Sequence, residues 1–272
     1  MPSGSTGPTL LFCPADRPDR YAKAAAAPDV VILDLEDAVA PDRKAAAREA
    51  LVATRLDPAT TVVRVNGAAT GLLDDDLAAV LAAGYRTIML AKAETAAQLD
   101  LLRHHRVIAL CETPLGVEQA AVLAAHPSVE ALAWGAEDLV AGLGGTSSRR
   151  PDGTYRDVAR YARSRVLVAA AAAGKVAYDA VHLDLVDDAG LAAEASDAAA
   201  SGFAGTLCLH PRQVPLVRAA YRPSAAAVDD AHALLAEAER SGAVFAWRGR
   251  MVDEPLLRQA RRTLDRLVGG DT

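Results

Sequence analysis

The chain has 272 residues, a formal net charge of −6, and a hydrophobic content of 51% to which aromatic residues contribute only 4%. The negative charge argues against a nucleic-acid-binding surface, and no apolar run is long enough to span a membrane. The polar N-terminal residues lack the basic and apolar regions of a signal peptide. We therefore expect a cytoplasmic protein with three reduced, buried cysteines, Cys13, Cys111 and Cys208.

Short apolar segments alternate with helix-like segments along residues 1–221. Near-continuous apolar runs of this kind are typical of parallel strands that are covered on both faces. The predicted strands are Thr9–Cys13, Asp29–Leu35, Thr61–Asn66, Arg86–Leu90, Val107–Cys111, Glu130–Trp134, Ala177–Leu183 and Thr206–His210. Eight such units predict an α/β fold, a closed TIM (β/α)8 barrel. An open doubly wound sheet is the alternative, but CPADRPDR after the first strand is not the glycine-rich turn it needs.

Two segments lie outside the eight units. The polar loop at residues 144–153, GGTSSRRPDG, follows the sixth strand and is a candidate lid. Residues 222–272 predict a helix over Ser224–Ser241, a short hairpin in VFAWRGRMVDEP, and a last helix from Pro255. A barrel does not need this C-terminal extension, so we expect it to have a separate role.

Charged and polar residues follow the predicted strands. In a parallel α/β barrel the carboxyl ends of all strands meet at one rim, which is where ligands bind. This rim set comprises Asp16, Arg17, Glu36, Asp37, Arg64, Asn66, Lys92, Glu94, Glu112, Asp138, Asp179, His182 and His210. Each has a plain structural interpretation when taken alone: Asp37 as a helix cap, Lys92 as a surface partner of Glu94, His210 as a donor to a backbone carbonyl.

Two acids in this set predict a metal site. Glu112 and Asp138 each follow an apolar strand, and carboxylate oxygens are the ligands that Mg²⁺ prefers. The alternative is that both acids are helix caps or first-turn acids.

Arg64 is the hardest residue of the set to explain by packing. It shares one face of its strand with Val62 and Asn66, opposite Val63 and Val65. A guanidinium in that position needs anionic partners, and we expect Glu36 and Asp37 to provide them.

Eight motifs in chain order resemble those of one enzyme family. They are LFCPADRPDRYAKA, VILDLEDAVAPDRKAAAREAL, VVRVNG, MLAKAET, ALCETPLGV, WGAEDL, LCLHPRQV and GRMVDEP. Together they resemble the citrate lyase β-subunit-like branch of the HpcH/HpaI aldolase superfamily. The resemblance implies a TIM barrel, a homotrimer, a bound Mg²⁺ ion and an acyl-CoA or acyl-carrier thioester of a 3-hydroxy acid as substrate. Citryl, malyl, citramalyl and 3-hydroxy-3-methylglutaryl thioesters are the typical ones.

The resemblance also implies roles for individual residues. Glu112 and Asp138 match the metal ligands, and Arg64, held by Glu36 and Asp37, matches the residue that stabilises the reacting oxygens. Substrate or CoA contacts are implied for Arg64, Glu112, Arg17, Lys23, Lys92, Gly135 and Ala136. Asp253 matches the Asp of a C-terminal lid that covers a neighbouring subunit, where we expect it to be the catalytic base. The alternative is that Asp253 only caps the last helix.

Other activities remain open at the level of sequence. The sugar-acid aldolase branch of the superfamily acts without CoA, but it typically has His after the Glu of the second loop, where this chain has Asp37. Thioester hydrolysis, as in a malyl-CoA thioesterase, and malate-synthase-like condensation would use the same site. The chain could also be the β subunit of a citrate lyase complex that acts on an acyl-carrier thioester, although Arg17 and Lys23 favour an enzyme that works alone on CoA thioesters.

Overall fold

The computed structural model describes residues 7–242 and 244–268, and its chain divides into two compact units, residues 1–217 and 218–272. The boundary falls inside helix α10 (Gln213–Tyr221), a few residues before the boundary expected from the sequence. No helix in the described part of the chain is long and apolar enough to cross a membrane.

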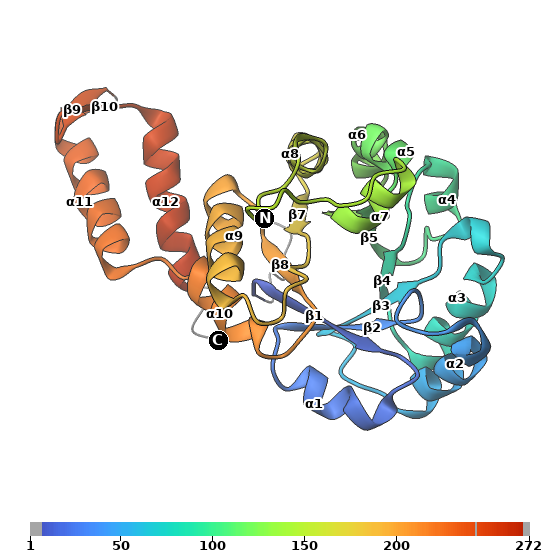
Figure 1. The fold of residues 1–272 in the computed structure, drawn as a ribbon. Coiled ribbons are helices and arrows are strands. Elements are labelled where there is room, and N and C mark those ends of the chain that lie inside the picture. The colour runs from blue at the N-terminus through green and yellow to red at the C-terminus, as the bar shows by residue number, and fades with distance from the viewer. Residues whose placement is uncertain (1–6, 243, 269–272) are drawn as a thin grey trace. The chain divides into compact units, whose positions relative to one another are not determined.

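The first unit is a closed barrel of eight parallel strands, as the sequence predicts (Figure 1). Each strand pairs with the next along the chain, and β1 pairs with β8 to close the sheet. The strands are β1 (Thr9–Pro14), β2 (Val30–Asp34), β3 (Thr61–Val65), β4 (Thr87–Leu90), β5 (Arg106–Cys111), β6 (Val129–Trp134), β7 (Val176–Asp179) and β8 (Gly205–Cys208).

Alternate residues of these strands point into the barrel and fill it. The interior cluster contains Ile32 of β2, Val62 of β3 and Met89 of β4, and all of them are buried. Because side chains alternate along a strand, Arg64 continues the inward-facing row that begins at Val62. The barrel interior is therefore apolar until its carboxyl-end rim, where charged side chains replace the aliphatic ones.

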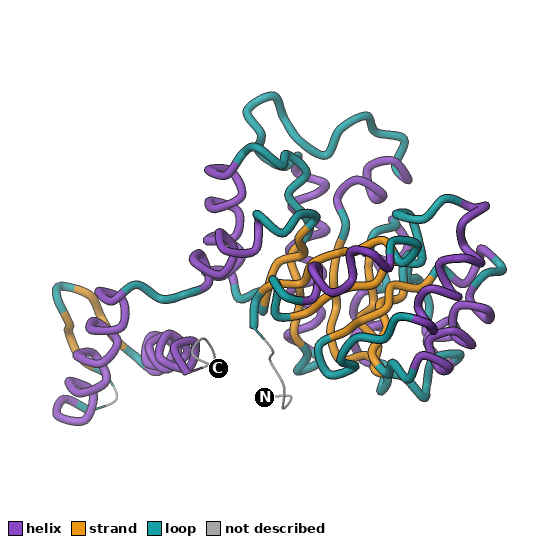
Figure 2. Tube along the Cα trace, turned by 90° about the horizontal axis from the view of Figure 1, so that it is seen from below, coloured by secondary structure: helices purple, strands orange, loops and turns teal. Residues whose placement is uncertain are grey.

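Helices lie around the outside of the strands, as the purple and orange segments of Figure 2 show. The α-helices of this unit are α1 (Tyr21–Ala25), α2 (Lys44–Ala53), α3 (Leu73–Ala83), α4 (Ala96–Asp100), α5 (Pro114–Glu118), α6 (Ala120–Ala125), α7 (Ala136–Gly142), α8 (Asp157–Ala172), α9 (Asp188–Ser201) and α10. Short 3-10 turns, Pro18–Arg20, Pro41–Arg43 and Ala68–Thr70, precede α1, α2 and α3.

The last two strands end earlier than the sequence predicts. β7 ends at Asp179 and β8 at Cys208, so His182 and His210 lie in the loops beyond them. Asp179 accepts a hydrogen bond from the N–H of Ala180 (3.0 Å), and Pro211 has no N–H to extend a strand after His210.

The C-terminal unit is a pair of helices joined by a hairpin. Helices α11 (Ala225–Ser241) and α12 (Glu254–Val268) pack through an apolar cluster of Ala231, Leu234, Val252, Leu257 and Ala260. Strands β9 (Phe245–Trp247) and β10 (Arg250–Val252) are joined by Arg248 and Gly249, whose φ angles of 47° and 78° suit a tight two-residue hairpin turn. The predicted hairpin and both predicted helices are thus present.

Candidate functional site

Arg64 is held at the end of β3 by carboxylates from the end of β2. Its Nε donates to Asp34 Oδ1 (2.8 Å) and its Nη2 to Asp34 Oδ2 (2.5 Å), and Nη1 lies 3.3 Å from Glu36 Oε2. The expectation of Glu36 as a partner is confirmed. Asp37 makes no direct ion pair with Arg64 among the described residues: its Oδ2 lies 3.2 Å from Lys92 Nζ, and Arg64 acts on it only through its charge. Burial alone would lower the pKa of Arg64, but Asp34 and Glu36 raise it above its ordinary value.

Glu112 follows β5 and carries a buried carboxylate with 3% exposure. Its Oε1 accepts a hydrogen bond from the backbone N–H of Lys92 (3.0 Å). Burial raises the pKa of Glu112 to about 8, Arg64 opposes that rise, and the nearby Asp138 adds to it. A buried carboxylate beside a second carboxylate is energetically costly unless a cation neutralises it.

The start of α7 is shaped around Glu112. A Cβ atom at Gly135 would lie 2.8 Å from Glu112 Oε2, so only glycine leaves room for the carboxylate. Gly135 is also the N-cap of α7, and Asp138 lies in the first turn of that helix. Thr113, not Glu112, caps α5. Neither acid is a helix cap, although Asp138 does occupy the first-turn position of the alternative interpretation.

Lys92 connects the two groups of acids. It is one of two non-glycine residues with positive φ among those described (52°), a strained conformation that places its N–H on Glu112. Its ammonium contacts Glu36 closely and lies 3.2 Å from Asp37 Oδ2 and 3.5 Å from Asp138 Oδ1. The interpretation of Lys92 as a surface partner of Glu94 is therefore wrong. Burial alone would lower the pKa of Lys92, but Glu36 and Glu112 outweigh it, so the pKa lies above its ordinary value. A raised pKa disfavours the neutral amine that a Schiff base requires.

The oxygen donors at the two strand ends suit a magnesium ion. Glu112 and Asp138 are close enough for their charges to interact, and Gly135 and Ala136 lie beside them at the start of α7. Among residues 7–242 and 244–268 no group of three His, Cys, Asp or Glu side chains could hold a metal. A two-carboxylate site fits Mg²⁺, which keeps several water or substrate oxygens in its shell.

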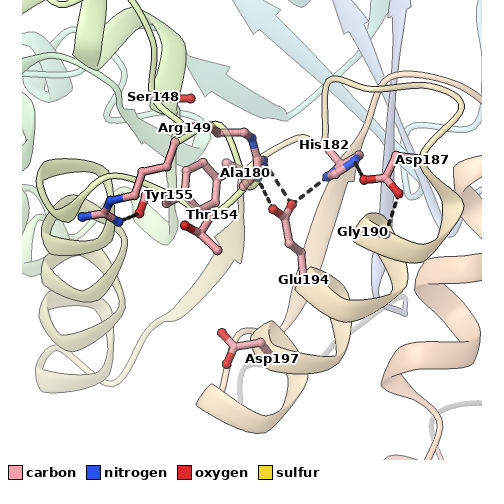
Figure 3. Close-up of polar contacts among 12 residues, drawn as sticks. Ser148, Arg149, Thr154, Tyr155, Ala180, His182, Asp187, Gly190, Glu194 and Asp197 are labelled. Carbon is pink, nitrogen blue, oxygen red and sulfur yellow. Dashed lines mark hydrogen bonds and ion pairs between the residues drawn. The ribbon is translucent and has the colours of Figure 1, made fainter.

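The rim residues after β7 have structural partners instead. Asp179 accepts hydrogen bonds from Trp134 Nε1 (2.6 Å) and from Arg163 Nη2 (2.8 Å). His182 donates through Nδ1–H to Glu194 Oε2 (2.8 Å), and this contact raises the pKa of His182. Figure 3 shows Glu194 of α9 between His182 and Arg149.

The loop that follows α7 is held by two neighbouring residues near its middle, Ser148 and Arg149. Arg149 pairs with Glu194 and stacks its guanidinium 4.0 Å from the ring centroid of Tyr155. Ser148 donates to Glu137 Oε1 (2.5 Å), next to Asp138 in the sequence. The candidate lid at residues 144–153 is thus bound to α7 and α9 in this conformation.

Three further predicted residues lie away from the carboxylates. Arg17 is half-exposed and pairs with Asp19 (2.9 Å), and Lys23 is exposed on α1. Asp253 belongs to the C-terminal unit, where its carbonyl accepts from the N–H groups of Leu256 and Leu257 at the start of α12. Its side-chain Oδ1 is buried and has no hydrogen-bond partner among the described residues.

Sequence reasoning missed Asp34, the main partner of Arg64. The two residues occupy the same register on neighbouring strands, and Asp34 continues the inward row of Val30 and Ile32. Aligning the predicted second and third strands so that Asp34 lies opposite Arg64 would have indicated this ion pair. Arg149 and Glu194 gave no comparable signal, because their contact depends on a loop conformation.

Comparisons with known proteins agree on one family. The family model of the HpcH/HpaI aldolase/citrate lyase matches residues 8–211. The citrate lyase subunit beta-like protein of Mycobacterium tuberculosis is 55% identical over 96% of each chain. Human mitochondrial citramalyl-CoA lyase is 32% identical over 87% of this chain and 78% of its own. A crystal structure of CitE from M. tuberculosis in complex with magnesium, acetoacetate and coenzyme A superposes with a TM-score of 0.94, at 55% identity and over 96% of this chain and 97% of that one.

Proposed function

The chain belongs to the HpcH/HpaI aldolase/citrate lyase family, and we propose that it is a Mg²⁺-dependent carbon–carbon lyase that cleaves a 3-hydroxyacyl-CoA into acetyl-CoA and an oxo acid. The observation that carries this proposal is the buried Glu112 carboxylate, set beside Asp138 and Arg64 at the barrel rim. Citramalyl-, malyl-, citryl- and 3-hydroxy-3-methylglutaryl-CoA are the candidate substrates. The complex of the M. tuberculosis relative with magnesium, acetoacetate and coenzyme A supports both the cofactor and the class of ligand.

Glu112 and Asp138 would hold the metal through carboxylate oxygens. When bound there, Mg²⁺ would supply Lewis-acid stabilisation to substrate oxygens. Lys92 keeps Glu112 in place through its backbone N–H, and Gly135 leaves the space that the carboxylate needs. Gly135 and Ala136 would also lie against the substrate at the start of α7.

Arg64 would act on the charge that develops during cleavage. When the 3-hydroxyl proton is removed, the oxygen forms the C=O of the oxo acid and the C2–C3 bond breaks. The electron pair of that bond forms the enolate of the acetyl thioester, which is then protonated. A guanidinium already fixed by Asp34 and Glu36 can donate to the enolate oxygen without reorganising, which is where preorganised donors contribute most.

Asp253 would be the base that takes the 3-hydroxyl proton, supplied by a neighbouring subunit of a homotrimer. The carboxylates beside the candidate metal site, Glu36, Asp37 and Asp138, are engaged with Arg64 or Lys92, and Glu112 and Asp138 would ligate the metal. Asp253, in contrast, has a buried Oδ1 that finds no hydrogen-bond partner in the described part of the chain. Arg17 and Lys23 would contact the CoA phosphates.

A product analysis tests the proposed activity. The purified protein is incubated with Mg²⁺ and each candidate 3-hydroxyacyl-CoA, and products are identified by mass. We expect acetyl-CoA and an oxo acid from at least one substrate. Free CoA with the intact 3-hydroxy acid would instead identify a thioesterase. Activity only on thioesters of an acyl-carrier protein would identify a citrate lyase β subunit.

A further inference from the structure

Lys44, at the start of α2, reaches back to the turn that follows β2. Its Nζ donates to the carbonyl oxygens of Leu35 (2.7 Å) and Glu36 (2.7 Å) and to Asn66 Oδ1 (2.9 Å). These three acceptors match the three N–H bonds of an ammonium group. Lys44 therefore ties the end of β2 to the end of β3 at the point where both strands have stopped pairing.

Asn66 and Asp76 extend this connection. Asn66 Nδ2 donates to the Leu35 carbonyl (3.0 Å) and to Asp76 Oδ2 (2.6 Å), and the same oxygen accepts from the Asn66 N–H (2.9 Å). Asp76, on α3, is fully buried and pairs with Arg48 Nε (2.7 Å). The centre of this network, Asn66 and Asp76, is buried and fully hydrogen-bonded, and the half-buried Lys44 and Arg48 close it on either side, which makes it rigid.

The residues that this network holds are next to those of the site. Leu35 donates its N–H to the carbonyl of Arg64 (2.9 Å), and Glu36 donates its N–H to Asp34 Oδ1 (2.8 Å). Asp34 Oδ1 is also the acceptor for Arg64 Nε. A shift of the turn at Leu35 and Glu36 would move both carboxylates that grip Arg64.

We propose that Lys44 is a positioning residue for catalysis, which fixes the Asp34–Arg64–Glu36 group by anchoring the two carbonyls beside it. The inference rests on the proposed function, since it assigns Arg64 a role in the reaction. Lys44 acts through the backbone of the β2–α2 turn.

The test replaces Lys44 with methionine, which keeps the length of the side chain and removes the three donors. We expect kcat to fall by about 10- to 100-fold, the range for small displacements of a catalytic group, with KM for the thioester nearly unchanged. We also expect the NMR signal of the Arg64 Nε–H, assigned by its loss in Arg64→Lys, to broaden through faster exchange with water. Lys44→Gln should lower kcat in the same way and serves if the methionine variant does not fold.

Arg48→Met is the matched control. It removes a cation from Asp76 in the same network but leaves the contacts of Lys44 with Leu35, Glu36 and Asn66 in place. We expect it to lower Tm while kcat and the Arg64 signal stay near wild type. Equal losses of kcat in both variants, or an unchanged Arg64 signal in the Lys44 variants, would overturn the inference. If the wild type cleaves none of the thioesters, the proposed function fails, and the Arg64 signal still tests Lys44.

Discussion

At the scale of single residues, the guanidinium of Arg64 shows how the site is prepared before a substrate arrives. Two of its nitrogens donate to one carboxylate, Asp34, in a side-by-side arrangement that only a planar fork can make. The cation is thus fixed in orientation as well as in charge. A lysine in its place would keep the charge and lose the orientation.

Arg64→Lys is therefore expected to lower kcat by about 100-fold or more, the loss typical of one preorganised oxyanion donor. Steady-state kinetics on the cleaved thioester measures it. Arg106→Lys is the control, because Arg106 pairs with Glu130 at the opposite end of the barrel strands. An unchanged kcat in Arg64→Lys would show that the charge alone is enough.

The metal site yields a prediction that does not depend on catalysis. Glu112→Gln and Asp138→Asn should each weaken Mg²⁺ binding at least tenfold by calorimetry, because Mg²⁺ tolerates neutral or displaced ligands poorly. Gly135→Ala should weaken it by about 10- to 100-fold without removing a ligand, since its Cβ would push Glu112 aside. Glu130→Gln should bind as the wild type does. Wild-type affinity in Glu112→Gln would mean that Glu112 is not a ligand, and wild-type affinity in Gly135→Ala would mean that the carboxylate can shift without loss of binding.

The sequence predicted which residues at the rim are unusual better than it predicted their partners. Glu112 and Arg64 stand out because a charge follows or interrupts an apolar strand, and that pattern is local. The contact of Asp34 with Arg64 spans 30 positions and that of Lys44 with Asn66 spans 22, so neither shows in a local sequence pattern. Such contacts depend on strand register and helix position, which composition does not encode.

At the scale of elements, α9 holds the loop that leads from α7 to α8. Glu194 contacts both Arg149 and His182, so one carboxylate joins the loop, the β7–α9 connection and the helix itself (Figure 3). The stability of this arrangement depends on pH through its two titrating groups, His182 and Glu194.

The contact with Glu194 raises the pKa of His182 above 6.5. The stability that protonated His182 adds to the fold is therefore fully present below pH 6.5 and is lost as the pH rises through the raised pKa. Burial alone would raise the pKa of Glu194, but His182 and Arg149 outweigh it, so the pKa lies below the ordinary 4.5. The stability that the ionised Glu194 contributes is therefore lost only when the pH falls through this lowered value. Glu194→Gln should therefore lower Tm by about 2–4 °C near pH 6, with a smaller deficit at pH 9, where His182 is neutral and Arg149 is the remaining charged partner.

Thermal unfolding of wild type and variant at both pH values measures this difference. Glu49→Gln, a change of the same kind on the exposed side of α2, should leave Tm nearly unchanged at each. A deficit that grows from pH 6 to pH 9 would show that His182 is not the titrating partner.

The elements themselves followed from the sequence with one class of error. Apolar runs located all eight strands, because a parallel strand buried on both faces has no polar side to confuse the pattern. The ends of β7 and β8 were placed too late, since apolar residues such as Val181 and Leu209 continue into the loops. The end of a strand depends on which backbone N–H and C=O groups still form hydrogen bonds with the neighbouring strand. Residue type is only weakly related to that.

At the scale of the whole molecule, the proposed role of Asp253 as the base of a neighbouring subunit gives the last prediction. Asp253→Asn subunits and Glu112→Gln subunits should each be inactive, yet partial activity should return when the two are mixed and allowed to exchange. In a ring assembled at random, roughly a quarter of the sites would combine an intact metal centre with an intact neighbouring Asp253.

Subunit exchange is checked separately with two affinity tags. Activity that stays at the level of the separate variants, despite exchange, would mean that Asp253 acts within its own chain or that another residue is the base. Glu49→Gln subunits, changed on the exposed side of α2, are mixed with wild type to provide the reference for dilution alone.

The closure of the barrel by β1 and β8 has a consequence for how the protein is made. Thr9–Leu11 must find Thr206–Cys208, strands at opposite ends of the first unit. A ribosome adds about 5–20 residues per second, so β1 is translated roughly 10 to 40 s before its second neighbour exists. During that interval the nascent sheet has two open edges, each able to pair with another chain. The polypeptide is therefore most prone to aggregate late in translation. The risk ends when the eighth strand leaves the ribosome and pairs with β1, which removes both open edges.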